Sequence, residues 1–244
     1  MSAVLAHDYA QCMEEQMRLI YDPSIDDYRN LPGVEIRVPE FGSARGFHDK
    51  NPLTPYPRWR TLFGAPYDWR HASPLPGQAS RAYTHFFKKL KALVEAASNK
   101  QGKKDILFGH SYGGMAVLEF VRNTPMAWRK KYIKHLFFGG AYAVARVRAA
   151  TTRPHLSVGK DDDATAEFQH DNFEESPKLV YGDGDEVVNL ISMLAFEEEM
   201  CRQPEQRKQF KSIKVHKTRH TELVTAEWAV NRVLPEIIAA NRIF

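Results

Sequence analysis

The chain has 244 residues, a length that suits one domain better than two. Hydrophobic residues make up 43% and charged residues 26%, a balance typical of a globular protein with enough apolar mass for a full core. The formal net charge of +4 would favour an anionic membrane surface, but it is too small to indicate a nucleic-acid-binding protein. We therefore expect a single domain over 1–244 with no nucleic-acid partner.

The sequence carries no signal for export, membrane insertion or metal binding. The first residues lack a basic stretch followed by an apolar one, so we expect no signal peptide. No apolar run approaches transmembrane length, which predicts a cytoplasmic chain or one peripheral to a membrane. Cys12 and Cys201 are too few for a disulfide scaffold and lack metal-ligand spacing, so we expect two ordinary thiols.

Four segments are expected before residue 100. Residues 34–39 alternate and end at a proline, which predicts a strand. Residues 45–60 contain three prolines and predict a loop, and residues 61–67 predict a second short strand. Over 79–98, apolar residues recur at helical spacing with lysines between them, which predicts a helix with one solvated face.

Strands and helices alternate through the rest of the chain. This alternation predicts an α/β fold with a mostly parallel sheet and helices on both faces. A polar stretch over 143–176 predicts an excursion from the core. The expected strands are 105–109, 133–138, 178–181 and 212–216, and the expected helices are 112–122, 189–201 and 221–240.

The segment Gly109-His-Ser-Tyr-Gly113 lies between an expected strand and an expected helix. That placement is typical of a nucleophile elbow, whose tight turn needs small residues two positions before and after the serine. Ser111 would then lie at a helix N-terminus, where backbone amides and the helix dipole stabilise developing negative charge. Ser111 is therefore the candidate nucleophile, and a glycine-rich turn without chemistry is the alternative.

An elbow serine requires an acid and then a histidine later in the chain. Asp183 and Asp185 follow an expected strand and compete for the role of the acid, although a plain polar turn fits the same residues. His220 lies between the last expected strand and the last expected helix, where the base is expected. His216 is nearby, but it belongs to the expected strand.

Several segments of this chain resemble the lecithin–cholesterol acyltransferase family, and most closely its plant acyltransferase-like branch. The most specific are Gly64-Ala-Pro-Tyr-Asp-Trp-Arg70 and Tyr181-Gly-Asp-Gly-Asp185. Other similar segments, which extend the resemblance to both ends of the chain, lie at 12–28, 32–43, 109–113, 128–135 and 220–221.

The resemblance implies an α/β-hydrolase-type fold with a catalytic triad and an oxyanion hole. It also implies a second group of residues at a strand end, which either shape the site or serve as core and salt-bridge scaffold. The implied assignments are Ser111 as nucleophile, Asp185 as acid, His220 as base, the amides of Phe41 and Tyr112 as oxyanion hole, and Asp68, Trp69 and Arg70 as the strand-end group.

The implied activity is that of a serine O-acyltransferase or phospholipase of lipid metabolism. An acyl group would pass from a glycerophospholipid through acyl-Ser111 to a sterol, a lysolipid or water, without a cofactor or a metal. Compared with the family, the chain lacks an upstream strand and is short between Gly42 and Gly64, and 143–176 leaves room only for a much reduced cap. These gaps keep two alternatives open: a catalytically inactive lipid-binding homologue, and a soluble short-ester hydrolase.

Overall fold

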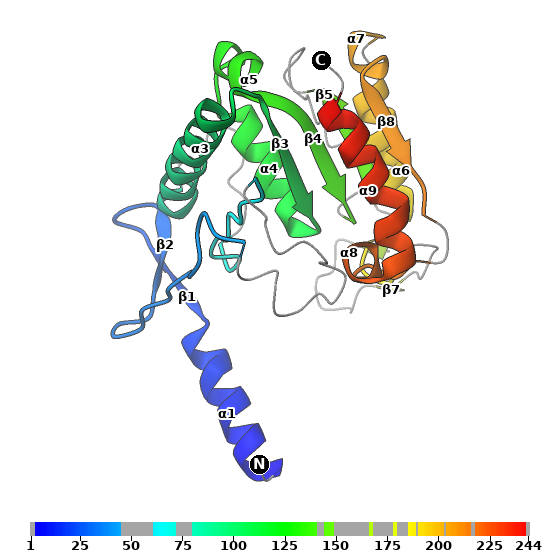
Figure 1. The fold of residues 1–244 in the computed structure, drawn as a ribbon. Coiled ribbons are helices and arrows are strands. Elements are labelled where there is room, and N and C mark those ends of the chain that lie inside the picture. Colours follow the sequence, from blue (N-terminus) through cyan, green and yellow to red (C-terminus); the bar gives the residue numbers. More distant parts are fainter. Residues whose placement is uncertain are drawn as a thin grey trace. The chain divides into compact units, whose positions relative to one another are not determined.

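The structure is a computed structural model in which the chain forms two compact units, Met1–Val94 and Glu95–Phe244 (Figure 1). The expected single domain over 1–244 stays a prediction, and the proline-rich segment 45–60 lies outside the described residues. The structure describes residues 3–44, 61–71, 80–140, 144–148, 166–167, 178–179, 185–188, 190–202, 204–215 and 218–242.

The first unit begins with a helix and a short hairpin. Helix α1 spans Ala3–Gln16, and strands β1 (Leu19–Asp22) and β2 (Asp27–Asn30) pair antiparallel. The turn between the strands is closed by side chains: the hydroxyl of Tyr21 donates to Asp26 at 2.7 Å. Asp26 has a φ of +48°, a conformation that aspartate adopts more readily than most residues. The turn chemistry thus sets the register of the hairpin.

The strands expected at 34–39 and 61–67 do not form, so both predictions are wrong. Residues 34–40 and 62–68 have no regular secondary structure. Residues 42–43, just after the first stretch, meet Gly64 of the second through two backbone hydrogen bonds, from the Gly42 amide to the Gly64 carbonyl at 2.8 Å and from the Gly64 amide to the Ser43 carbonyl at 3.0 Å. A strand needs a neighbouring strand to complete its hydrogen bonds, and among the described residues neither segment has one.

Helix α3 spans Arg81–Gln101, which confirms the helix expected at 79–98. Its first turn is capped from two sides, because Asp27 accepts from the Arg81 amide at 2.7 Å and Ser80 from the Tyr83 amide at 3.4 Å. The buried face of the helix comprises Tyr83, Phe86, Leu90, Val94 and Ala97. Lys88 and Lys89 are exposed, as expected, whereas Lys91 is partly buried.

The second unit is built on a four-stranded sheet in the order β3-β4-β5-β8. Strands β3 (Asp105–His110) and β4 (Ile133–Gly139) are parallel, whereas β5 (Val144–Arg148) and β8 (Phe210–Ile213) extend the sheet antiparallel. Among the described strands, one neighbouring pair is parallel and two are antiparallel, while β3, β4 and β8 all run in the same direction and β5 runs against them. The expectation of a mostly parallel sheet is therefore confirmed only in part. Strands β3 and β4 are joined by a helical connection. The short link from β4 to β5 can only reverse the chain, since a parallel connection needs a dozen or more residues.

Helices cover both faces of this sheet (Figure 1). Phe137 of β4 packs with Val233 and Ala240 of helix α9 (Glu227–Arg242). The next residue, Phe138, meets Phe196 of helix α6 (Leu190–Cys201) at 5.6 Å between ring centroids. Because successive side chains of a strand point to opposite faces, α9 and α6 lie on different sides of β4.

The remaining elements agree with the sequence in type but differ in their bounds. The helix expected at 221–240 is two helices, α8 (Glu222–Thr225) and α9, because Ala226 between them is extended. Strand β8 ends at Ile213 rather than at residue 216. Strand β5 lies inside the excursion expected at 143–176, so the excursion begins no earlier than residue 149. The other short elements are α5 (Met126–Tyr132), α7 (Pro204–Arg207), β6 (Ala166–Glu167) and β7 (Lys178–Leu179), and β6 and β7 pair with each other.

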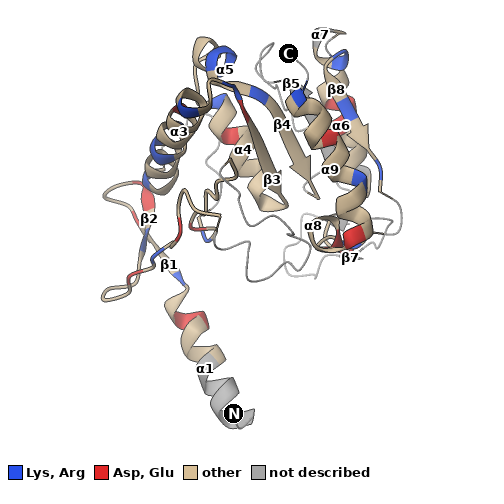
Figure 2. Cartoon of the chain, viewed as in Figure 1, with Lys and Arg blue, Asp and Glu red and all other residues tan. Residues whose placement is uncertain are grey.

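Lysines gather where β3 and β4 begin (Figure 2). Lys103 and Lys104 precede β3, Lys130 and Lys131 lie in α5, and Lys134 follows at the start of β4. Burial and the charges of the first two lysines lower the pKa of Lys134. Since His110 ends β3, the positive charge lies at the opposite end of the sheet from the candidate nucleophile. In the described part of the chain, no helix is long and apolar enough to span a membrane.

Asp105, the first residue of β3, makes the stability of the fold depend on pH. Burial raises the pKa of its half-buried carboxyl from 3.8 to about 6, and its Oδ2 has no hydrogen-bond partner among the described residues. The folded state therefore keeps the proton at a pH where the unfolded chain has lost it. The stability that this provides is present below pH 3.8 and is lost as the pH rises through about 6.

Replacing Asp105 with asparagine is expected to flatten this pH dependence. The amide carries no charge, so the variant should gain roughly 1 kcal/mol over the wild type between pH 4 and pH 7.5, a value reduced for the partial exposure of the carboxyl. Urea unfolding at the two pH values measures the difference. Glu198→Gln, at an exposed position of α6, is the matched control. An equal pH dependence in wild type and Asp105→Asn would contradict the prediction.

Candidate active site

Ser111 occupies the turn between β3 and α4 (Tyr112–Arg122), as the sequence predicts. Its backbone has φ +54° and ψ −131°, a strained conformation for a residue with a side chain. The Ser111 amide donates to the carbonyl of Gly139 at 2.8 Å, and the Gly114 amide donates to the Ser111 carbonyl at 2.8 Å. The end of β4 and the first turn of α4 therefore hold the serine in the geometry of a nucleophile elbow.

The two glycines of the elbow differ in how much space surrounds them. A Cβ atom on Gly109 would lie 2.4 Å from the carbonyl oxygen of Gly113, a backbone atom that has no room to move away. A Cβ atom on Gly113 would meet nothing within 4 Å among the described residues. The expectation that side chains would collide at both positions is thus correct for Gly109 and wrong for Gly113. The turn brings the helix backbone against Gly109, while Gly113 faces away from this contact.

Asp185 and His220 meet although they are 35 residues apart in the chain. The Nδ1 atom of His220 lies 2.7 Å from Oδ2 of Asp185, and the amide of His220 donates to the Asp185 carbonyl at 2.8 Å. The other carboxylate oxygen accepts from the amides of Val187 at 3.2 Å and Val188 at 2.8 Å. The carboxylate is thus oriented by backbone amides on one side and faces the imidazole on the other. The competing residues Asp183 and His216 lie outside the described residues.

The pairing with Asp185 fixes how the His220 ring is used. Because a carboxylate only accepts, Nδ1 of His220 carries the hydrogen and the neutral ring keeps its lone pair on Nε2. His220 is buried, and its Nε2 has no hydrogen-bond partner in the described part of the structure. A buried ring nitrogen with a free lone pair is suited to accept a proton from a substrate or a nucleophile.

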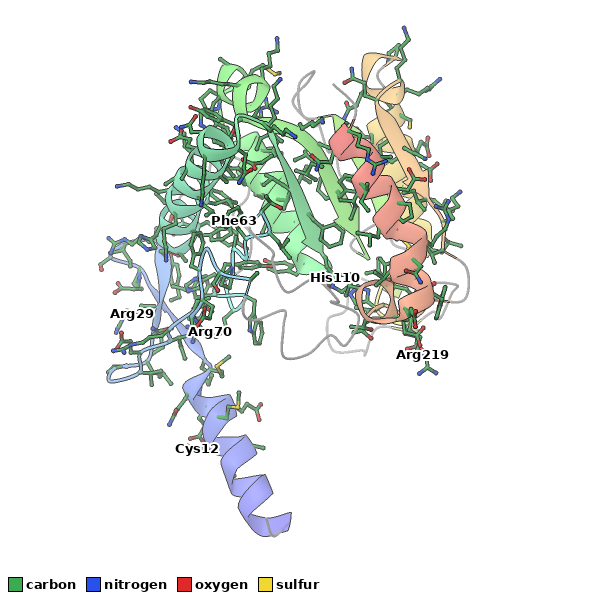
Figure 3. The ribbon with its side chains drawn as sticks, viewed as in Figure 1. Cys12, Arg29, Phe63, Arg70, His110 and Arg219 are labelled. Carbon is green, nitrogen blue, oxygen red and sulfur yellow. The ribbon has the colours of Figure 1, made fainter. Side chains whose placement is uncertain are left out.

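The His220 ring lies beside the residue that precedes Ser111. Its centroid is 5.0 Å from that of His110. His110 lies at the end of β3 (Figure 3). A Cβ atom on Gly140 would lie 3.1 Å from Nε2 of His110 and 3.2 Å from Cε1 of His220, so both rings pack against this glycine. Sequence reasoning used His110 only as the variable position of the elbow and gave Gly140 no role. The pair Gly139-Gly140 at the end of an apolar strand was the available signal.

The two residues predicted to supply the oxyanion hole belong to different units. Tyr112 is the first residue of α4, and its side chain is partly exposed. Phe41 lies in the first unit, where its ring meets Phe86 edge-on at 6.4 Å and Lys89 lies 4.4 Å from its centroid. Glu40 beside it has φ +60°, a strained conformation of the kind that clusters at functional sites. The role of the two amides stays a prediction.

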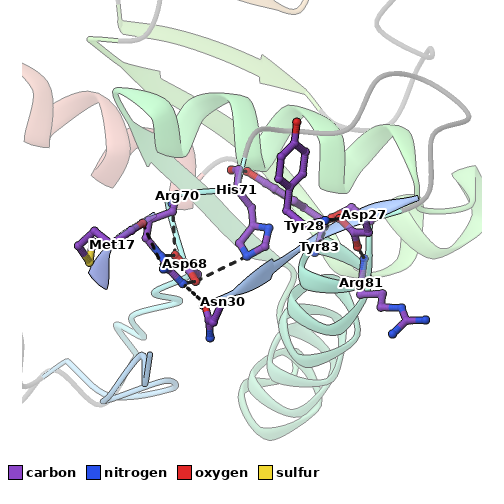
Figure 4. A network of polar contacts seen from close by, with 10 residues as sticks. Met17, Asp27, Tyr28, Asn30, Asp68, Arg70, His71, Arg81 and Tyr83 are labelled. Carbon is purple, nitrogen blue, oxygen red and sulfur yellow. Dashed lines mark hydrogen bonds and ion pairs between the residues drawn. The ribbon is translucent and has the colours of Figure 1, made fainter. Parts of the chain in front are cut away.

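The residues predicted to shape the site from a strand end form a polar network in the first unit (Figure 4). The buried guanidinium of Arg70 donates to both oxygens of Asp68, at 2.9 and 2.6 Å, and to Asn30 at 2.6 Å. It thereby joins the end of β2 to residues 68–70. Burial of Arg70 and the double contact favour the scaffold interpretation, whereas Trp69 is 67% exposed. That Asp68, Trp69 and Arg70 help to shape the site around Ser111 stays a prediction.

Cysteine and metal chemistry have no visible basis in the described residues. Cys12 is exposed and Cys201 partly buried, and both are free thiols. Among the residues that the structure describes, no group of three or more histidine, cysteine or acidic side chains is arranged to hold a metal ion.

A serine on a strand–helix turn, with an aspartate–histidine pair later in the chain, is the arrangement typical of enzymes with a serine nucleophile. A family model described as lecithin:cholesterol acyltransferase matches residues 1–160. The chain belongs to the lecithin:cholesterol acyltransferase family. The match includes Ser111 and ends before Asp185 and His220, so the contact between the last two is an independent observation.

Named relatives are plant and animal members of the same family. The chain is 39% identical over 153 residues to lecithin-cholesterol acyltransferase-like 1 of Arabidopsis thaliana, covering 55% of this chain and 35% of that protein. It is 33% identical over 145 residues to human phosphatidylcholine-sterol acyltransferase, covering 53% and 31%. It is 28% identical over 169 residues to the bovine lysosomal phospholipase A and acyltransferase, covering 60% and 40%. The chain thus spans between 31% and 40% of the length of these relatives.

Proposed function

We propose that this chain is a serine-dependent lipid acyltransferase or phospholipase, with Ser111 as nucleophile, His220 as base and Asp185 as acid. The observation that carries the proposal is the 2.7 Å contact between Asp185 and His220, because the ring of His220 also packs against His110, the residue that precedes Ser111. Three groups required for acyl transfer are thus found in the required chain order. An α/β-hydrolase-type fold with a reduced cap is part of the proposal.

The proposed reaction has two halves. In the first, Ser111 Oγ attacks the carbonyl carbon of a glycerophospholipid ester while Nε2 of His220 takes the serine proton. The tetrahedral intermediate collapses, the lysolipid leaves with that proton, and the acyl group stays on Ser111. In the second half, the hydroxyl of an acceptor attacks the acyl-serine and gives its proton to His220. The bond between the acyl carbon and Ser111 Oγ then breaks, His220 returns the proton to Oγ, and the new ester or acid leaves. Asp185 holds the His220 ring and stabilises its charged form throughout.

The amides of Phe41 and Tyr112 are proposed to stabilise the oxyanion in both halves. Tyr112 is the first residue of α4, so its amide lies at the N-terminus of the helix, where the helix dipole favours negative charge. It also follows Ser111 directly, which is where one oxyanion donor of an elbow is expected. No step of the proposed reaction calls for a metal or a cofactor.

The substrate class comes from the names of the relatives. A phosphatidylcholine-sterol acyltransferase and a phospholipase A and acyltransferase both match this chain. We therefore infer a glycerophospholipid donor and a sterol, a lysolipid or water as acceptor. Such a donor resides in a bilayer, so the proposed enzyme works at a membrane surface.

The proposal is tested with phosphatidylcholine vesicles, with and without sterol, and mass spectrometry of the products. Wild type should release lysolipid and form a free fatty acid or a sterol ester, and a fluorophosphonate probe should label it at Ser111. Ser111→Ala, the control, should do neither. Vesicle binding equal in wild type and Ser111→Ala, without acyl release or labelling, would indicate the inactive lipid-binding homologue instead. Turnover of short-chain esters but not of phosphatidylcholine would indicate the short-ester hydrolase.

A further inference from the structure

His110 contacts the residue proposed as the base, although 110 positions separate the two in the chain. Its Nε2 atom lies 3.0 Å from the backbone carbonyl oxygen of His220. A carbonyl oxygen only accepts, so Nε2 of His110 carries the hydrogen. Burial lowers the pKa of His110, which keeps its ring neutral near pH 7 and leaves this nitrogen as its donor. The contact is therefore a directed hydrogen bond from one imidazole to the main chain of the other histidine.

This hydrogen bond completes the fixation of His220. Asp185 holds the amide of His220 at 2.8 Å and its Nδ1 at 2.7 Å, and His110 holds its carbonyl oxygen. Both backbone polar groups of His220 are thus anchored, and so is one of its two ring nitrogens. Only Nε2, the atom that must reach the serine proton, is left without a hydrogen bond among the described residues. The loop that carries the base can therefore shift little without breaking one of these contacts.

Packing between the two rings also holds His220 against His110. The two imidazole rings lie at 41° with centroids 5.0 Å apart, and Gly140 below them has no side chain to separate them. Gly140 has φ +67°, which further favours glycine at this position. His110 is also bonded covalently to Ser111 and ends the strand that carries it. One side chain thus joins the strand of the nucleophile to the loop of the base.

We propose that His110 is a positioning residue: its side chain holds the His220 loop at the distance from Ser111 that proton transfer requires. This inference rests on the proposed function, because it assigns the serine and the histidine their chemical roles. His110 itself transfers no proton and touches no substrate in this scheme. Its effect is on geometry, and misplacement of a catalytic group by about 1 Å can lower a rate 10²-fold.

Two substitutions separate the hydrogen bond from the packing. His110→Phe keeps a ring of similar size against Gly140 and His220 but removes the donor. His110→Gln has a side-chain amide of similar reach and keeps the donor. We expect His110→Phe to lower kcat by about tenfold with KM unchanged, and His110→Gln to retain most of the activity. The rate of fluorophosphonate labelling at Ser111 should fall in parallel with kcat.

If His110 had only a structural role, its substitutions would lower the stability of the fold and would not separate His110→Phe from His110→Gln in kcat. Thermal unfolding and circular dichroism therefore accompany each variant. The same substitutions at the exposed His85 of α3 serve as controls that should change neither kcat nor KM. Full activity of His110→Phe, or an equal loss of kcat in His110→Gln and His110→Phe, would overturn the proposal.

A second readout keeps the inference testable if the wild type shows no acyl transfer or labelling. The Nδ1 proton of His220, hydrogen-bonded to Asp185, should give a downfield proton NMR signal in the wild type. We expect His110→Phe to broaden or lose this signal and His110→Gln to keep it. An unchanged signal in His110→Phe would overturn the positioning role. If the wild type shows no acyl transfer or labelling but the NMR signals follow the expected pattern, the result would contradict only the proposed function.

Discussion

Asp185→Asn is expected to lower kcat by about 10⁴-fold while leaving the fold intact. The carboxylate accepts the Nδ1 hydrogen of His220 at 2.7 Å. An amide group presented to Nδ1 donates instead, so the imidazole would carry its hydrogen on Nε2 and lose the lone pair that takes the serine proton. Steady-state turnover of a short-chain ester, together with fluorophosphonate labelling of Ser111, measures the loss.

Asp183→Asn is the matched control for this substitution. Both aspartates fit the sequence pattern for the acid. Asp185 contacts Nδ1 of His220 at 2.7 Å, and Asp183 lies outside the described residues. Asp183→Asn should therefore retain most of the wild-type kcat. A larger loss in Asp183→Asn than in Asp185→Asn would assign the acid to the other aspartate.

Gly109→Ala is expected to lower the free energy of unfolding by about 3 kcal/mol and to abolish labelling of Ser111. The new methyl group would lie 2.4 Å from the Gly113 carbonyl oxygen. Relief requires the end of β3 and the first turn of α4 to separate. Because Ser111 lies between them and its strained backbone depends on both, the nucleophile would move as well. Urea unfolding monitored by circular dichroism measures the change.

Gly113→Ala provides the comparison within the same motif. This position is helical, its φ is not in the left-handed region, and an added Cβ meets nothing within 4 Å among the described residues. Alanine there should raise the free energy of unfolding by roughly 0.5–1 kcal/mol, because it reduces the freedom of the unfolded chain. A destabilisation of Gly113→Ala equal to that of Gly109→Ala would contradict the steric explanation of the elbow.

Elements with local hydrogen bonds were predictable from the sequence. The apolar spacing over 79–98 and the stretch after Ser111 predict helices α3 and α4, and the structure contains both. A helix closes its hydrogen bonds within four residues. The strands expected at 34–39 and 61–67 fail for the opposite reason, since a strand is completed only by a partner that its own sequence does not name.

The direction of the strands in the sheet could not be predicted from the local sequence pattern either. Strand β5 lies in a stretch that is polar and irregular by composition, yet it pairs with β4 and β8. Its antiparallel course follows from the short connection after Gly139, which cannot hold a crossover helix. An alternating pattern of strands and helices predicts parallel neighbours where a helix joins them, and β3 and β4, which are joined in this way, are parallel.

The sequence by itself determined the family, the elbow and its serine, because these depend on adjacent residues with fixed spacing. The residue pattern alone left the acid open between two aspartates, the family resemblance assigned it to Asp185, and neither gave His110 a role. Tertiary structure decided which described carboxylate meets His220 and showed that His110 holds the same residue from the other side. Both contacts join residues that are 35 and 110 positions apart in the chain. Contacts over such separations form only when the sheet brings its strand ends together, and no local pattern encodes them.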